Sequence, residues 1–412
     1  MIPTHALDTN IMSRIDDLAA LSESPDGLIR RYLTRQHRQA NELVGQWMGD
    51  AGMDVRQDAV GNIIGRYEGG GEGLPAIIIG SHLDTVIMAG KYDGTLGVVS
   101  AIDCVRSLNQ RAIRLPFAIE VVGFVDEEGA RFQTTCMGSR ALAGTFDSTL
   151  LERHDGDGIS MAEAMRRFGL DPDRIGDAAR NPEDVAAYLE LHIEQGPVLE
   201  SEGLAVGAVT AIAGATRLVV AVKGAAGHAG TVPMELRQDA LIAASECVLA
   251  VEEVAARQPG VVGTVGRMEV EPGAANVIAG MVTFTVDLRA DEDKKRRSAL
   301  VDLDGRMGEI ALRRSVEIAA ETVHDAASVS CAPWIMEQID QAIEELGGRP
   351  FRLPSGACHD AVAMADIADV GMIFVRCHGG ISHNPDESIS EDDAAAGARL
   401  LRQVIEKFKR EA

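Results

Sequence analysis

The chain has 412 residues, 46% hydrophobic and 4% aromatic, a length that can bury one large core and a second, smaller one. It carries 39 Lys and Arg against 63 Asp and Glu, and the resulting net charge of −24 repels nucleic acid and anionic membrane surfaces. No apolar run approaches the roughly 20 residues needed to span a bilayer, and no basic segment leads into an apolar stretch at the N-terminus. We therefore expect a cytoplasmic protein without nucleic-acid or membrane partners.

The cysteines show no pattern typical of a disulfide framework or a zinc knuckle. They contain no C-x-x-C pair, which favours reduced and mostly buried thiols, and the sequence assigns them no chemistry. They are Cys104, Cys136, Cys247, Cys331, Cys358 and Cys377.

The first half of the chain alternates helices with apolar strands. Helical periodicity covers Leu28 to Met53, and a helix is expected over 97–108. Strands are predicted at 61–67, 76–83 and 117–125. Because these strands are almost continuously apolar, they indicate a sheet covered on both faces. Ser160 opens a short helix through a capping box.

The order of predicted helices and strands changes near Ala213, and the earlier alternation resumes after Cys331. Strands at 216–222 and 282–288 flank a helix at 236–256, and a further helix is expected at 294–312. After Cys331 the sequence predicts a helix at 334–346, a strand at 372–375 and a helix at 392–409. The simplest α/β architecture is a catalytic domain in two segments, 1–212 and 331–412, with a smaller domain, 213–330, inserted between them.

Imidazole and carboxylate groups collect where the predicted strands end, which is where open α/β sheets bind ligands. Taken singly, each is better explained as a satisfied side chain or a solvated loop residue; taken together, they suit divalent metals such as zinc or manganese. A carboxylate shared by two ions would make the site dinuclear. The residues are His82, Asp84 and Asp93 after one strand, Asp126, Glu127 and Glu128 after another, His192 and Glu194 in LELHIEQG, and His383 in GGISHNPDE.

Neighbouring side chains in these segments can have different roles, one as a metal ligand and the other in proton transfer. Successive residues leaving a strand point differently, so one of Glu127 and Glu128 can ligate while the other acts as general base. Asp84 lies two positions after His82, on the same side of an extended segment. We therefore expect the Asp84 side chain to hold the second ring nitrogen of His82.

The ordered motifs resemble a known enzyme family along nearly the whole chain. They are GSHLDTVxxxGxxDGxLGV, DEEGARF with GSRALAG, LHIEQGPVLE, GHAGTVPM, NVI with FTVDLR, SGACHDA and GISHNPDE. In this order they are similar to the carbamoyl-amidohydrolase branch of the dinuclear zinc aminoacylase and carboxypeptidase G superfamily. The resemblance implies a two-domain dinuclear metallohydrolase whose sheet-plus-helices catalytic domain carries a smaller α/β lid and dimerisation domain.

The resemblance also implies roles for individual residues. His82, Asp93 and His192 match the ligands of one ion, and Asp93, Glu128 and His383 match those of the other. Glu127 matches the general base, and Asp84 the partner of His82. Peptidase relatives often have an acid at the position of His192, so this histidine favours a carbamoyl substrate over a peptide.

Substrate contacts follow from the same motifs. Arg217 and Arg289 correspond to arginines that bind the substrate carboxylate, for which a planar guanidinium is suited. Asn276, Gln195 and Gly356 correspond to further substrate-binding positions. His228 matches a histidine that acts as oxyanion donor across a dimer interface, which implies a homodimer.

Two positions depart from the family pattern, and other protein classes are less compatible with the motifs. Cys358 and Gln133 replace the small residue and the glycine that are usual there, which affects specificity, and His359 and Asp360 are expected to support the site from behind. The sequence lacks a dehydrogenase glycine fingerprint and a G-x-S-x-G motif. An inactive metal-binding homologue is the remaining rival. Among ureido acids, allantoate is the expected substrate, with N-carbamoyl-L-amino acids or N-carbamoyl-β-alanine as alternatives.

Overall fold

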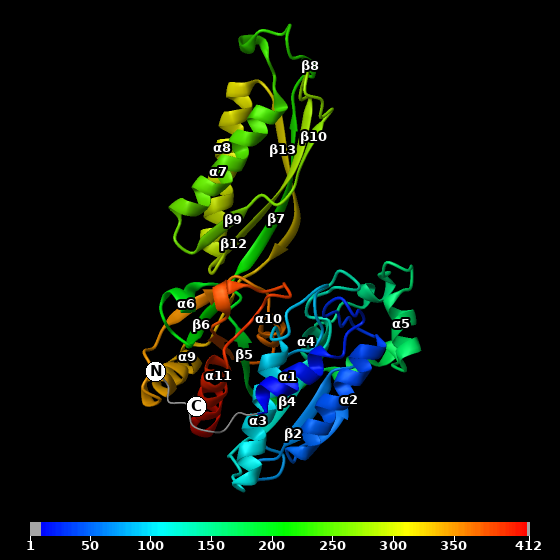
Figure 1. Cartoon of the computed structure of the whole chain (residues 1–412), viewed down its shortest axis with the longest axis vertical. Coiled ribbons are helices and arrows are strands. Elements are labelled where there is room, and N and C mark those ends of the chain that lie inside the picture. Colours follow the sequence, from blue (N-terminus) through cyan, green and yellow to red (C-terminus); the bar gives the residue numbers. More distant parts are fainter. Residues whose placement is uncertain (1–9, 410–412) are drawn as a thin grey trace. The chain divides into compact units, whose positions relative to one another are not determined.

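The computed structural model describes residues 10–409, which fold into two compact units that are described here one at a time (Figure 1). Within that range the first unit contains the residues up to Thr210 together with Cys331–Leu353 and the residues from Cys358 onward; the second contains Ala211–Ser330 and Pro354–Ala357. The sequence analysis had placed Pro354–Ala357 in the final catalytic segment, whereas it clusters with the second unit. Among residues 10–409, no helix is both long and apolar enough to cross a membrane.

The first unit is built on a mixed sheet whose central strands are buried along their full length. β3 pairs in parallel with β4 and with β5, and β5 pairs in parallel with β16. Every residue of these strands is buried, which confirms the prediction of a sheet covered on both faces. The strand order is β1 (Asp54–Gln57), β2 (Ile63–Tyr67), β4 (Ala118–Phe124), β3 (Ala76–His82), β5 (Val185–Ile193), β16 (Val370–Val375), β6 (Val206–Ile212) and β14 (Val329–Ser330), with β15 (Arg352–Ser355) also beside β6.

Helices cover this sheet and share its core. Ile77 and Ile79 of β3 belong to one buried cluster with Val98 and Val105 of α3, as the alternation of side chains along a strand requires. The helices of the first unit are α1 (Ile11–Ala19), α2 (Arg35–Asp50), α3 (Thr95–Gln110), α4 (Met137–Leu142), α5 (Met161–Phe168), α6 (Val198–Ser201), α9 (Pro333–Glu345), α10 (Ala361–Met364) and α11 (Glu391–Lys407).

Two helix starts show how capping decides a boundary. α5 begins where predicted, with the Ser160 hydroxyl accepting the Glu163 N–H. α2 begins at Arg35 and not at Leu28, so the predicted start was wrong. The Thr34 hydroxyl accepts the His37 N–H and caps the helix. The residues before Thr34 are irregular, and the backbone of Arg30 exchanges hydrogen bonds with Thr85 instead.

The second unit is an antiparallel sheet with two helices packed on one face (Figure 1). Along β12 buried and partly exposed residues alternate, and the buried ones form a core with α7 and α8. The elements are β7 (Gly214–Lys223), β8 (Gly227–His228), α7 (Ala240–Arg257), β9 (Val261–Thr264), β10 (Met268–Glu271), β11 (Val277–Ile278), β12 (Met281–Ala290), α8 (Asp293–Arg314), β13 (Glu317–Ala326) and β14 (Val329–Ser330).

The start of α7 differs from the prediction by one turn. The Asp239 carboxylate accepts the N–H groups of Leu241 and Ile242, so the helix begins at Ala240 and leaves Leu236 outside it. β7, β12 and α8 contain the ranges predicted for them.

Candidate metal centre

The candidate ligands of the first unit meet at one edge of its sheet. β3 ends at His82, and β4 ends just before the acidic run Asp126–Glu128. β5, parallel to β3, carries His192 near its own carboxyl end. Because parallel strands end at the same edge, residues distant in the chain become neighbours. His383 reaches the same place from the loop that precedes α11.

The carboxylate of Asp93 stands between two pairs of ligand atoms. Its Oδ1 lies 3.0 Å from His192 Nε2 and 3.5 Å from His82 Nε2. Its Oδ2 lies 3.2 Å from His383 Nε2, which is also 3.3 Å from Glu128 Oε1. Both groups, His82, Asp93, His192 and Asp93, Glu128, His383, have ligand atoms close enough to hold a metal ion. Sequence reasoning had predicted the same two sets, with Asp93 in both.

The hydrogen bonds of the two buried histidines leave their Nε2 atoms facing Asp93. His82 Nδ1 lies 3.0 Å from the Asp84 carbonyl oxygen, and His192 Nδ1 lies 2.8 Å from the Ile193 carbonyl oxygen. A carbonyl oxygen only accepts, so Nδ1 carries a proton and Nε2 is the nitrogen that faces Asp93: it donates to this carboxylate when protonated and offers a lone pair to a cation when not. Asp93 Oδ1 and His192 Nε2 are buried without a hydrogen-bond partner. A cation between these atoms would satisfy all of them, so the donor set fits a divalent metal.

The charge state of Asp93 suits this arrangement. Burial by itself opposes ionisation, but the facing imidazoles of His192, His383 and His82 hold the pKa of Asp93 well below its usual range. The carboxylate is therefore ionised wherever the neighbouring imidazoles are in place.

Contrary to the prediction from the sequence, the Asp84 side chain does not bind the ring of His82. The ring of His82 is held by the backbone carbonyl of Asp84, and the Asp84 carboxylate turns to the loop after β4. There Oδ1 accepts the Glu127 N–H and Oδ2 accepts the Glu128 N–H, each at 3.1 Å. The prediction assumed an extended chain beyond His82, but β3 ends at that residue and the following side chains point elsewhere.

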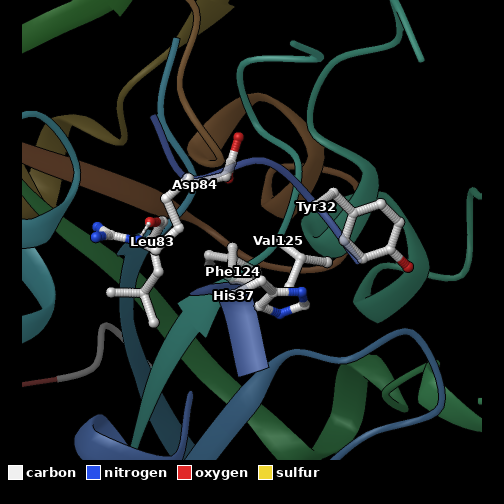
Figure 2. Close-up of a pocket in the computed structure, with 7 residues that line it drawn as sticks. Tyr32, His37, Leu83, Asp84, Phe124 and Val125 are labelled. Carbon is white, nitrogen blue, oxygen red and sulfur yellow. Dashed lines mark hydrogen bonds between the residues drawn. The ribbon is translucent and has the colours of Figure 1, made fainter. Parts of the chain in front are cut away.

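A small cavity is lined in part by Asp84. Figure 2 shows the Asp84 carboxylate pointing away from Phe124 and His37, which line this cavity. Arg30 also lines it, and its Nε donates to the Leu83 carbonyl at 2.7 Å. Burial lowers the pKa of Arg30 to about 10. The Arg30 guanidinium still carries a positive charge at neutral pH, which partly offsets the buried Asp84.

Glu127 is buried beside the two ligand groups without belonging to either. Its ligand atoms lie near those of His82 and Glu128, and its Oε1 accepts from the Cys136 thiol at 3.6 Å. Burial, followed by the neighbouring Cys358, raises the pKa of Glu127 well above its usual range. A carboxyl in such a place can take up a proton and give it back.

Two further polar residues brace Asp93. Glu387 Oε1 accepts the N–H groups of Tyr92 and Asp93, at 2.9 and 3.1 Å, and its Oε2 accepts the Ser382 hydroxyl. Sequence reasoning missed Glu387, although it lies in the same motif as His383. Gln195, predicted to touch substrate, donates from Nε2 to Asp93 Oδ2 at 3.1 Å. In the first unit Gln195 therefore lies against the Asp93 carboxylate.

The backbone around the centre is bent in ways that L-residues seldom adopt. Asp126, Gln195 and His383 have φ values of 53°, 58° and 53°, in the left-handed region. Such conformations cluster at functional sites because the surrounding structure must impose them. Gly94, with φ 68°, lies so close to His82 that a Cβ there would be 2.6 Å from the ring Nδ1. The glycine thus lets Asp93 approach the histidine.

The remaining residues that the sequence analysis named in the first unit differ in their placement, and His359 and Asp360 are the two predicted to lie behind the site. The buried ring of His359 packs edge-on against His192, with centroids 4.5 Å apart. Asp360 is also buried, as expected of a supporting residue. Gln133 is exposed, and Glu194 caps α6 through the N–H groups of Val198 and Leu199.

The predicted carboxylate-binding arginines lie in the second unit and share one aspartate. Arg217 Nε donates to Asp287 Oδ2 at 2.9 Å, and Arg289 makes a two-point contact with the same carboxylate at 2.8 and 3.1 Å. Arg289 Nη1 also donates to the Gly356 carbonyl at 2.7 Å. One negative and two positive groups on the exposed face of β7 and β12 leave a net positive charge.

His228 and Asn276 lie together at the β8–β11 pair of the second unit. Both are exposed, and the Asn276 carbonyl accepts the Ala229 N–H. His228 Nδ1 accepts the Gly230 N–H at 3.0 Å, which places the imidazole proton on Nε2. The ring therefore presents a hydrogen-bond donor.

Comparisons with known proteins agree along most of the chain. Residues 78–407 match the model of the peptidase family M20/M25/M40. An N-carbamoyl-L-amino acid amidohydrolase of Geobacillus stearothermophilus is 43% identical over 96% of this chain and 97% of its own length. An allantoate deiminase of Arabidopsis thaliana is 40% identical over 96% of this chain and 81% of its own length. The crystal structure of an amidase of the hydantoinase/carbamoylase family from Burkholderia multivorans matches with a TM-score of 0.91 at 33% identity, covering 98% of each chain.

Proposed function

The chain belongs to the peptidase family M20/M25/M40, in its carbamoyl-amidohydrolase branch, and from this premise we propose that it removes the carbamoyl group from a ureido acid in a metal-dependent hydrolysis. The observation that carries the proposal is the Asp93 carboxylate between two pairs of ligand atoms, with Glu127 buried beside them. All of these groups are present, which favours an enzyme over an inactive homologue.

We assign two divalent ions, zinc or manganese, to the centre. His82, Asp93 and His192 would hold one, and Asp93, Glu128 and His383 the other, since imidazole and carboxylate suit both metals. When bound, the pair supplies Lewis acidity toward the attacking water and the carbamoyl oxygen.

Glu127 moves the proton in this proposal. Its carboxylate takes a proton from the attacking water, and the oxygen adds to the carbamoyl carbon. Glu127 then gives the proton to the nitrogen that leaves, and the ureido acid and water yield the free amine, ammonia and carbon dioxide. The hydrogen bond from the Glu127 N–H to Asp84 fixes the backbone of this residue during both transfers.

Substrate recognition is assigned to the second unit. The pair Arg217 and Arg289, held by Asp287, offers guanidinium groups to the substrate carboxylate, with the Gly356 carbonyl beside Arg289. Asn276, which lies with His228 at the β8–β11 pair, is assigned a separate substrate contact. We further propose a homodimer in which the His228 Nε2–H of one subunit donates to the oxyanion in the site of its partner.

Allantoate is the first candidate substrate, and N-carbamoyl-L-amino acids are the second because of the relative at 43% identity. N-carbamoyl-β-alanine is the third. The test is an ammonia-release assay of the protein reconstituted with zinc or manganese against these three compounds. We expect turnover of at least one, and none with Glu127→Gln at equal metal content by elemental analysis. Full activity of that variant would refute the general base; no turnover of any ureido acid by the metal-loaded protein would refute the proposed function.

A further inference from the structure

Two cysteines far apart in the chain touch each other beside the proposed base. Cys136 Sγ lies 3.4 Å from Cys358 Sγ, although 222 residues separate them. Cys136 Sγ also lies 3.6 Å from Glu127 Oε1 and 3.6 Å from the His359 carbonyl oxygen. The sequence predicted scattered, reduced cysteines. The structure instead brings two thiols into contact with each other and one of them into contact with the Glu127 carboxyl group.

The two thiols differ in their exposure to solvent. Cys358 is exposed, whereas Cys136 is fully buried behind it. A solute oxidant therefore reaches Cys358 first and Cys136 only through it. The contact with Cys136, together with the neighbouring Glu127 carboxyl group and the charge of Arg140, lowers the pKa of the Cys358 thiol to about 7. A substantial fraction is thiolate at neutral pH, which is the form that reacts with peroxides.

We propose that Cys358 and Cys136 form a reversible disulfide when the protein meets a hydroperoxide, and that this bond switches the enzyme off. The Cys358 thiolate attacks one peroxide oxygen, the O–O bond breaks, and with one proton a water leaves, giving a sulfenic acid. The Cys136 sulfur then attacks the Cys358 sulfur, and the sulfenic oxygen leaves as a second water. Two thiols are oxidised and one hydrogen peroxide is reduced to two waters.

The bond would act on Glu127 through contacts already described. A disulfide sets the sulfurs about 2.05 Å apart, so the two segments must close by roughly 1.3 Å. The backbone N–H of Cys136 donates to the Glu127 carbonyl at 3.1 Å, and the Cys136 thiol is a donor to the Glu127 carboxylate. Oxidation removes the thiol proton and pulls on the loop that carries the base. The loss of activity rests on the proposed function; the disulfide itself does not.

The test separates these two parts. The metal-loaded protein is treated with hydrogen peroxide, and intact mass together with non-reducing peptide maps is followed beside ureido-acid turnover. We expect a loss of two hydrogen masses, a cross-linked pair of peptides holding Cys136 and Cys358, and at least a tenfold fall in turnover. Dithiothreitol should reverse all three. Cys358→Ser should retain its turnover in peroxide, and Cys247→Ser, a buried cysteine of the second unit, should behave as wild type.

Several outcomes would overturn the inference. One is a wild-type protein that loses activity without forming the cross-link; another is a Cys358→Ser variant inactivated at the wild-type rate. Cross-linking that leaves turnover unchanged would refute the switch. A disulfide that forms in a reduced protein with no ureido-acid turnover would instead refute the proposed function alone. Because Cys136→Ser alters a buried site, the melting temperature of this variant is measured first. If Cys136→Ser fails to fold, the comparison with wild type in peroxide is made with Cys358→Ser alone.

Discussion

Asp84 holds Glu127 by its backbone: Oδ1 of Asp84 accepts the Glu127 N–H at 3.1 Å, while its other oxygen accepts the N–H of the next residue. One buried carboxylate thus fixes the loop that carries both the proposed base and a proposed ligand. The histidine two residues earlier is held by a backbone carbonyl and needs no help from this side chain.

Replacing Asp84 should therefore disturb two glutamates and spare His82. We expect Asp84→Ala to lower turnover and metal affinity by about 10- to 100-fold, as loss of groups that orient ligands commonly does. Asp84→Asn keeps one acceptor oxygen and should be milder. Metal content by elemental analysis and kcat are the measurements, with Asp157→Asn, an exposed aspartate, as control. Equal, undiminished values for Asp84→Ala would contradict the assigned role.

Gly94→Ala should damage the centre by sterics alone. The added Cβ would lie 2.5 Å from the His82 carbonyl and 2.6 Å from its ring, so the histidine has to move. Gly73 offers a matched control, because its φ of 64° is also positive but a Cβ there meets nothing within 4 Å. Both variants carry about 1 kcal/mol or more of backbone strain. Only Gly94→Ala should lose metal, by about tenfold or more in affinity; equal metal content in the two variants would refute the steric account.

Arg289→Ala should weaken substrate binding. Loss of a charged hydrogen bond costs roughly 1.5–3 kcal/mol, or about 10- to 100-fold in KM, for a ureido acid. An analogue in which the carboxylate is an amide serves as control, because its KM should change little. An unchanged KM for the acid would remove Arg289 from the binding site. Asp287→Ala, which frees both arginines, should raise KM as well.

The proposed homodimer predicts complementation. Glu127→Gln and His228→Ala subunits are each expected to be inactive alone. Mixed dimers contain one site with an intact base and a donor histidine from the partner, so mixing should restore part of the turnover. Confirmed mixed dimers without recovery would exclude a role for His228 across the interface.

His37 should make folding stability depend on pH. Burial lowers the pKa of His37 from 6.5 to about 3, so the folded chain keeps it neutral where the unfolded chain binds a proton. Its contribution is complete above pH 6.5 and falls as the pH is lowered toward 3. His37→Gln lacks this group, so its stability deficit relative to wild type should shrink between pH 7 and pH 4.5. Urea midpoints with a chelator present test this, with exposed His154→Gln as control; a constant deficit would contradict it.

The sequence predicted those strands and ligands that depend on local pattern. The apolar runs of β3 and β4 need no information from elsewhere, and the acids and histidines after them follow from where such runs stop. The start of α2 was mispredicted because residues 28–34 have helical spacing, but the backbone of Arg30 within them bonds to Thr85, 55 residues away. Such a competing partner cannot be seen in a local window.

The residues that support the centre were harder still to predict from the sequence. The direction of the Asp84 side chain depends on the residue at which β3 ends, and a one-residue change would turn it to the other face. The contact between Cys136 and Cys358 joins loops from opposite parts of the chain. Neither has a periodicity or spacing that marks it in advance.

The bonds from Glu387 to the N–H groups of Tyr92 and Asp93 span 295 and 294 residues. On a ribosome the N-terminal strands emerge first, so the histidine and the acids of the early motifs are synthesised long before Glu387 and His383. A nascent chain that stops short of them would hold an incomplete set of the proposed ligands, and its Asp93 backbone would lack the hydrogen bond to Glu387. Full metal uptake would thus mark a finished polypeptide, and the cell would not lose ions to fragments.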